Sequence, residues 1–173
     1  MAQLPESSAK FLTSSRQGKF PCDSVDHNLF FMGSEYQSDF VKDLASMKLN
    51  EGWTVTYWSL QVLYYIGCQQ VVIVGMDHSF KQSGKPGKLE VFKGPDVNHF
   101  DESYFAGKQW HLAGLQNNEK YYRIAKKQFE QAGRKIIDAT VGGKCNVRRR
   151  TSPSFSANHS PLRLAVATLL AST

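Results

Sequence analysis

Polar side chains follow a short apolar segment near the middle of the chain. The apolar segment spans residues 71–74, and Asp77, His78 and Ser79 come a few positions later. A continuous β-branched run is typical of a strand buried on both faces, and ligands of open α/β sheets bind beyond the carboxyl ends of such strands. A carboxylate there can bind a sugar hydroxyl or a Mg²⁺ ion that bridges phosphates. An equally weighted alternative is that Asp77 caps a loop and His78 is solvated.

A second histidine, His99, lies in a polar segment that follows this strand. Its neighbours Asp96 and Asn98 carry side chains that can orient an imidazole. Since a histidine titrates near neutral pH, His99 can act as a general base. Asp96 and Asn98 are also ordinary turn formers, so a simple turn remains an open alternative. His111, further along, either lines the same site or packs beneath the segment.

Two weaker groups complete the candidate site. Tyr104, Phe105 and Trp110 can stack on a base or a sugar face, although anchoring of a loop to the core is favoured. The glycine turn at 140–144 can hold a phosphate, but a plain turn is favoured because the P-loop spacing is absent. The sequence has no Ser-His-Asp order, zinc spacing, dinucleotide motif or kinase signature. These residues alone predict a ligand site with a histidine-bearing lid, and no particular reaction.

Helical periodicity on either side of the buried strand predicts the elements that position these side chains. The helix before the strand is capped by Thr54 or Thr56 and ends at Gly67. Its apolar face is predicted at Leu60, Leu63, Tyr64 and Gly67. A second helix is predicted over 115–132, ending at Gly133. Its apolar stripe is predicted at Tyr121, Ile124, Ala125 and Phe129.

Shorter segments complete the predicted order of elements. Strands are expected over 28–32 and 135–140, a helix or helical turn over 38–47, and a long irregular lid over 81–107. Strands that alternate with helices indicate an α/β fold with a parallel sheet and right-handed crossovers. The predicted divisions are a flexible segment at 1–26, the α/β domain at 27–147, and a basic tail with a short apolar helix at 148–173.

Composition places the chain among ordinary globular proteins. Its 173 residues are 41% apolar and 21% charged, which suits one domain with a real core. No apolar run reaches membrane-spanning length, and residues 1–16 lack the apolar region of a secretory signal. Cys22, Cys68 and Cys145 are odd in number and not at metal-like spacing. They indicate a reduced, cytoplasmic protein without a bound metal.

The net charge of +6 comes partly from three consecutive arginines at 148–150 and from basic residues over 126–135. One interpretation is an anionic partner, which includes peripheral contact with the head groups of a membrane. The favoured interpretation is a solvated basic face and tail, because the aromatic interleaving of single-strand binders is absent. No nucleic-acid partner is expected.

Three stretches of the chain resemble one bacterial family. They are GWTVTYWSLQVLYYIGCQQVVIVGMDHSF at 52–80, PDVNHFDESYFAGKQWH at 95–111 and RKIIDATVGGK at 134–144. Together they are similar to the MptE-like family, whose domain is shared with archaeal 6-hydroxymethylpterin diphosphokinases and whose bacterial members often sit with surface-polysaccharide genes. The resemblance implies a Rossmann-like three-layer sandwich with a mainly parallel sheet. Here that fold is expected to lack its N-terminal strand or strands.

A more distant similarity is to small bacterial α-2,3/2,8-sialyltransferases, which use CMP-sialic acid without a metal. It implies that His99 is the catalytic base and that Asp77 is the strand-tip aspartate of the site. In this chain Val55 stands where those enzymes have a serine, and Ser79 where they have a phosphate-binding tyrosine. Substrate or nucleotide binding is expected for Thr54, Thr56, His78, Ser79, Asn98, Tyr104, Trp110 and His111.

The resemblance therefore predicts a glycosyltransferase of surface-polysaccharide synthesis, with a CMP-type nucleotide-sugar donor, a glycan acceptor and no cofactor. One alternative is a pterin-type diphosphokinase that uses ATP and Mg²⁺ with Asp77 near the metal, and another is a non-enzymatic α/β module. Residues 1–31 do not match the glycine-rich nucleotide turn of either family, so an incomplete or inactive form is also expected. A sheet edge left open by the missing strand predicts self-association into a homo-oligomer.

Overall fold

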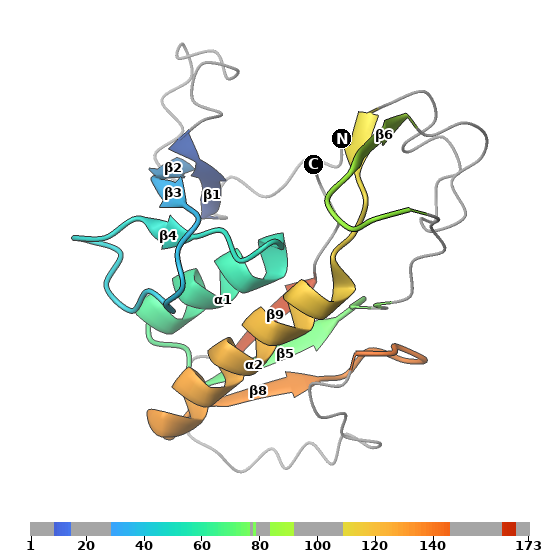
Figure 1. Cartoon of the computed structure of the whole chain (residues 1–173). Helices are drawn as coiled ribbons and strands as arrows, with labels where there is room; N and C mark the ends of the chain where they lie inside the picture. The colour runs from blue at the N-terminus through green and yellow to red at the C-terminus, as the bar shows by residue number, and fades with distance from the viewer. Residues whose placement is uncertain are drawn as a thin grey trace.

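A computed structural model describes residues 9–14, 29–76, 78, 84–91, 109–145 and 164–168, with the backbone alone for Trp110 and for 164–168. In chain order the elements are β1 (Lys10–Thr13), β2 (Leu29–Met32), β3 (Ser34–Glu35), β4 (Leu49–Asn50), α1 (Val55–Tyr65), β5 (Gln70–Val74), β6 (Leu89–Val91), β7 (Gln109–His111), α2 (Leu115–Gln131), β8 (Lys135–Asp138) and β9 (Leu164–Thr168) (Figure 1). The predicted strand at 28–32, both flanking helices, and the strands at 71–74 and 135–140 are confirmed.

The described strands form one sheet of three strands and three pairs. The larger sheet has the order β8, β5, β9, and all its strands are parallel, so that Gln70 lies between Lys135 and Leu164. β1 pairs with β2 and β3 with β4, both in parallel, whereas β6 and β7 are antiparallel. The described part of the chain is therefore mixed α/β with short, mainly parallel sheets.

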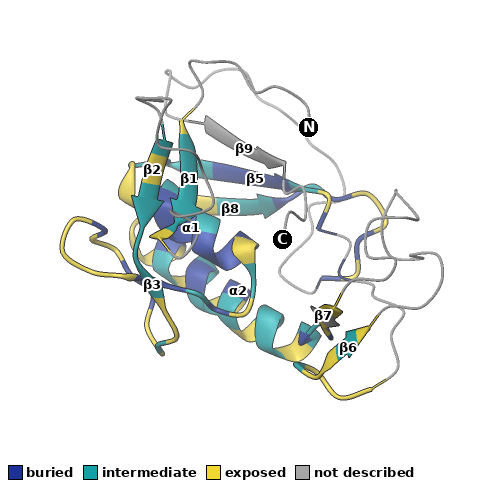
Figure 2. Ribbon diagram, turned by 90° about the horizontal axis from the view of Figure 1, so that it is seen from above, coloured by how far each residue is buried: buried dark blue, intermediate teal, exposed yellow. Residues whose placement is uncertain are grey.

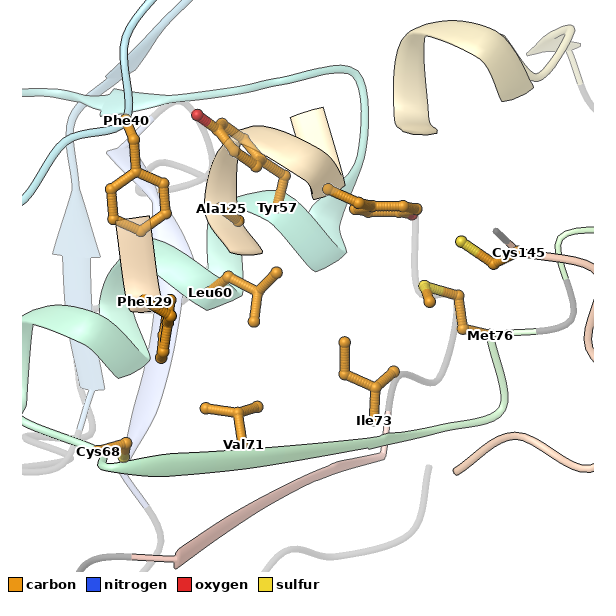
Figure 3. Close-up of a cluster of buried hydrophobic side chains, with 11 residues drawn as sticks. Phe40, Tyr57, Leu60, Cys68, Val71, Ile73, Met76, Ala125, Phe129 and Cys145 are labelled. Carbon is orange, nitrogen blue, oxygen red and sulfur yellow. The ribbon is translucent and has the colours of Figure 1, made fainter. Parts of the chain in front are cut away.

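One apolar cluster joins α1, α2 and β5. Val71 and Ile73 lie on the same face of β5 because strand side chains alternate, and they point toward the helices (Figure 3). Phe129 of α2 packs edge-on against Tyr64 of α1, with ring centroids 5.2 Å apart. Both described helices therefore cover one face of β5. Val72, on the other face, is also buried, as predicted for this strand.

A second apolar cluster packs on another side of α1. Its buried members are Val41, Leu44, Leu49, Trp58 and Val62, and Phe11 of β1 and Met32 of β2 pack against it. Gln61 of α1 is completely buried, and its Oε1 accepts the N–H groups of Val41 at 3.2 Å and Asn50 at 3.1 Å. Helix α1 therefore has buried residues beyond the predicted face of four, because it packs against both clusters. Figure 2 colours its buried segments dark blue.

The predicted ends of both helices are confirmed. Thr54 is the N-cap of α1, where its Oγ1 accepts the N–H of Thr56 at 3.2 Å. Beyond α1, Gly67 has a φ of +87°, and Gly133 has a φ of +71° beyond α2. This left-handed conformation carries no steric penalty for glycine, which is why the helices stop there. Neither described helix is long and apolar enough to cross a membrane.

Of the two alternatives predicted for 38–47, a regular helix does not form, and the segment is irregular with a turn at residues 44–46. The carboxylate of Asp43 accepts the N–H of Ala45 at 3.0 Å and the hydroxyl of Ser46 at 2.6 Å. Such local bonds offer the backbone an alternative to the helical pattern. The periodic residues Phe40 and Leu44 are nevertheless buried, so the spacing identified core positions and not the conformation.

Three further segments differ from the prediction. Within 1–26, Lys10–Thr13 is a strand and not a flexible segment, because it pairs with β2. Within the predicted irregular lid, Leu89–Val91 is a strand that pairs with β7. The expected apolar C-terminal helix is also wrong, because Leu164–Thr168 forms strand β9 along the edge of β5. Hydrogen bonds to that edge of β5 pair the backbone N–H and C=O groups of β9, and they outweigh the helical tendency of its sequence.

Candidate functional site

Buried polar residues gather where β5 and β8 end. The group comprises Thr56, His78, Asp138 and Thr140, with the buried phenol of Tyr122 beside them. Helix α1 precedes β5 and helix α2 precedes β8, and each helix runs antiparallel to the strand that follows it. Both helices therefore begin at this end of the sheet (Figure 1). Polar atoms are seldom buried unless a bond compensates them, so this concentration marks the candidate site.

Thr140 joins the ends of the two strands. Its Oγ1 accepts the N–H of Met76 at 3.0 Å, and its own N–H donates to Oδ1 of Asp138 at 2.9 Å. A Cβ on Gly143 would lie 3.0 Å from the carbonyl oxygen of Met76, so a side chain there would require that backbone to shift by a few tenths of an ångström. The backbone that leads from β5 to His78 is therefore held from the β8 side.

His78 lies at the tip of β5 in a strained conformation. Its φ of +52° is in the left-handed region, which side-chain-bearing residues seldom adopt. Its imidazole is 5% exposed, and Nε2 lies 3.2 Å from Oε1 of Glu119. The other oxygen of Glu119 accepts from Arg123 at 2.6 Å, so the carboxylate is held between two partners. Strain of this kind persists where surrounding contacts fix the residue, often at functional sites.

Tyr122 connects this histidine to the start of α1. Its hydroxyl lies 3.1 Å from Oγ1 of Thr54, and its ring centroid lies 6.2 Å from that of His78. Burial raises the pKa of the Tyr122 phenol, although hydrogen bonds with Thr54 and Thr56 oppose the rise. The phenol therefore stays neutral at physiological pH, and its hydroxyl can both donate and accept.

The structure thus brings three of the predicted binding residues into one cluster. Thr54, Thr56 and His78 meet around Tyr122. His111 is exposed in β7, opposite Leu89. The backbone of Trp110 lies in the same strand. The remaining predicted site residues, Asp77, Ser79, Asn98, His99 and Tyr104, lie outside the described residues.

Three residues of the site, Tyr122, Glu119 and Asp138, are not among the residues that the sequence predicts. Tyr122 shares helical spacing with Ala125 and Phe129, a signal that was available but was assigned to its neighbour Tyr121. Glu119 and Arg123 form an i, i+4 pair that reads as a surface salt bridge. Only the position of His78 reveals that Glu119 also faces the strand tip.

One carboxylate oxygen in this region has no partner among the described residues. Asp138 is 2% exposed, and its Oδ2 makes no hydrogen bond there, while Oδ1 accepts from Thr140. The described residues contain no group of three or more His, Cys, Asp or Glu side chains that could hold a metal ion. The arrangement is suited to binding a polar ligand through an imidazole, hydroxyl groups and the starts of two helices.

Comparisons were made with family models, with curated proteins and with solved structures. None of the three found a match for this chain.

Proposed function

We propose that the chain is a glycosyltransferase of the sialyltransferase type, with a CMP-type nucleotide-sugar donor and a glycan hydroxyl as acceptor. The site lies at the carboxyl ends of β5 and β8, in a Rossmann-like domain that acts in the cytoplasm. The observation that carries the proposal is the contact between the buried His78 and the part-buried Glu119 beside Tyr122 and Thr54. Polar groups at the strand ends of an α/β sheet are the usual setting for a nucleotide.

His78 is the residue assigned to the donor phosphate. Nε2 lies 3.2 Å from Oε1 of Glu119, so Nδ1 is the ring nitrogen left to hydrogen-bond a phosphate oxygen. Neither described helix has an acidic residue in its first turn. The partial positive charge at both helix starts therefore favours an anion at this end of the sheet.

The transfer step is assigned to His99, on the resemblance. The acceptor oxygen forms the bond to the anomeric carbon of the donor sugar. The bond between that carbon and the phosphate oxygen breaks, and CMP leaves with the electron pair. His99 takes the proton of the acceptor hydroxyl, and Asp77 contacts the donor. A divalent metal is not required for this step.

A thermal-shift panel tests the ligand class. The panel contains CMP, CMP-sialic acid, a UDP-sugar, ATP with Mg²⁺, and a pterin. Stabilisation by CMP and CMP-sialic acid in the presence of EDTA is expected, because binding to the native state raises the melting temperature. If ATP with Mg²⁺ is the only condition that raises the melting temperature, the transferase is rejected. If no compound raises it, a non-enzymatic module is favoured.

Substitution of His99 tests the reaction. His99→Ala should abolish sugar transfer to an acceptor glycan and leave the melting temperature unchanged. The control is Tyr65→Ala, which removes an exposed ring at the end of α1. Full turnover by His99→Ala would remove His99 as the base.

A pterin-type diphosphokinase is the second candidate, and Asp138 favours it. Its Oδ2 has no partner among the described residues, and it lies where the strands end. A carboxylate oxygen is a ligand that Mg²⁺ prefers. Loss of ATP binding in EDTA, together with its loss in Asp138→Asn, would support this candidate over the transferase.

A further inference from the structure

Trp53 precedes the first helix in an unusual conformation. It has a φ of +64° and follows Gly52, whose φ is +53°. The indole is 47% exposed although the backbone around it is strained. Large aromatic side chains rarely occupy the left-handed region, so the tertiary contacts of the ring must hold it there.

The indole of Trp53 packs against two glycines. A Cβ on Gly87, before β6, would lie 3.3 Å from Cζ3 of Trp53, and a Cβ on Gly114 would lie 3.2 Å from Cε3. Gly114 has a φ of −93°, which any residue can adopt, so its backbone does not require a glycine. The room that it leaves is occupied by the six-membered ring of Trp53.

The indole borders the site described above. The next residue, Thr54, is bonded to Tyr122, and Tyr122 lies against the imidazole of His78. Gly114 is the N-cap of α2, the helix that carries Glu119 and Tyr122. A partly exposed aromatic ring therefore stands at the edge of the cluster, and its position is fixed by contacts from two other elements.

We propose that Trp53 is the stacking platform for the base of the nucleotide. This inference rests on the proposed function, because it assigns a base to the ligand whose phosphate His78 binds. An indole offers a flat apolar surface that suits a planar heterocycle, and such stacking tolerates different bases. Trp53 thus contributes affinity for the base, while His78 contributes affinity for the phosphate.

Isothermal titration calorimetry of the full chain tests the platform with two probes, CMP and ribose 5-phosphate. The second probe has the sugar and the phosphate but lacks the base. Trp53→Ala should weaken CMP binding about tenfold, as expected for the loss of one stacked base, and should leave ribose 5-phosphate binding unchanged. Trp53→Phe should retain most of the affinity for CMP. Tyr65→Ala, which removes an exposed aromatic ring at the other end of α1, should bind both probes normally.

Any other result overturns the stacking role of Trp53. The results also distinguish failure of this stacking role from failure of the proposed function. Normal CMP affinity in Trp53→Ala, or an equal loss for both probes, overturns the platform and leaves the transferase standing. If the wild-type chain binds neither probe, the proposed function and the platform both fail. Should Trp53→Ala not fold, Trp53→Leu keeps an apolar contact with the two glycines without a ring. Trp53→Leu is then judged by the same criteria.

Discussion

The two ends of the layer formed by β5 and β8 are built differently. At the amino end, glycines stop both helices and backbone groups close the connections, with the N–H of Cys68 donating to the carbonyl of Leu63 and that of Lys135 to Gln69. At the carboxyl end, buried side chains make the connections, as in the bonds of Thr140 and Tyr122.

The difference separates stability from function. Backbone turns need little more than a glycine. The amino end also has a side-chain connection, because the part-buried guanidinium of Arg134 donates to the carbonyl of Tyr64 at 2.6 Å. The carboxyl end contains buried hydroxyl groups and a strained His78. It also contains Oδ2 of Asp138, which has no hydrogen-bond partner among the described residues. Features that cost stability and that no packing need explains are expected where a protein binds or reacts. Four substitutions test this contrast.

Phe129→Ala should have the largest effect. The ring is completely buried near the glycine-capped end, against Phe40 and Tyr64. Removing it should lower the free energy of unfolding by about 3–5 kcal/mol, as measured by urea denaturation, with little change in ligand affinity of the folded fraction. Phe30→Ala, at an exposed ring of β2, is the control and should cost clearly less. Equal losses in the two variants would contradict the assignment of this end to stability.

Thr140→Val should affect stability and ligand binding together. Valine keeps the shape of threonine but cannot accept the N–H of Met76, which the strand ends bury. An unsatisfied buried N–H costs about 1–3 kcal/mol, and the tip that carries His78 loses its support. Thr140→Ser keeps the hydroxyl and should retain most of the affinity. Unfolding in urea and calorimetry with CMP measure the two effects, and unchanged values in Thr140→Val would show that the bond does not matter.

The pH dependence of the stability of Tyr122→Phe tests the role assigned to the carboxyl end of the layer. Burial raises the pKa of Tyr122 above its ordinary value of 10.0 in the folded state. The stability from the neutral phenol is therefore present below pH 10 and is lost as the pH rises through the folded pKa. The variant should lose about 1 kcal/mol at neutral pH with the bond to Thr54, but should resist alkaline unfolding better than the wild type. A steeper alkaline loss in the variant would refute this assignment.

His78→Asn should change stability least and binding strongly. Asparagine tolerates the left-handed conformation of this position better than most residues, so the melting temperature should shift by only a few degrees. The imidazole is lost, and CMP binding should weaken more than tenfold if it contacts the phosphate. Met47→Asn, at an exposed side chain between β3 and β4, is the control. Normal CMP affinity in His78→Asn would break the contrast between the two ends.

The local parts of the fold were predictable from the sequence. Thr54, Gly67 and Gly133 set helix ends through short-range geometry, and the β-branched run of β5 identifies a buried strand without reference to the rest of the chain. For the same reason the glycine-capped end of the layer was predicted almost completely.

The parts that depend on distant partners were not predictable. Asp43 turns the backbone where apolar spacing favoured a helix. Glu119 reads as a surface partner of Arg123 until the fold places His78 against it. The resemblance supplied Thr54 and Thr56 as binding residues, and the polar strand tip supplied His78, but the way in which Tyr122 joins them is a tertiary contact.

The position of β9 has a consequence for how the chain refolds. β9 pairs in register with all of β5, although Leu164 is far from Gln70 along the chain. Closing so large a loop is slow compared with forming neighbouring contacts. During that interval β5 presents an open row of backbone N–H and carbonyl groups to other molecules. Recovery of the native state from denaturant should therefore fall as the protein concentration rises.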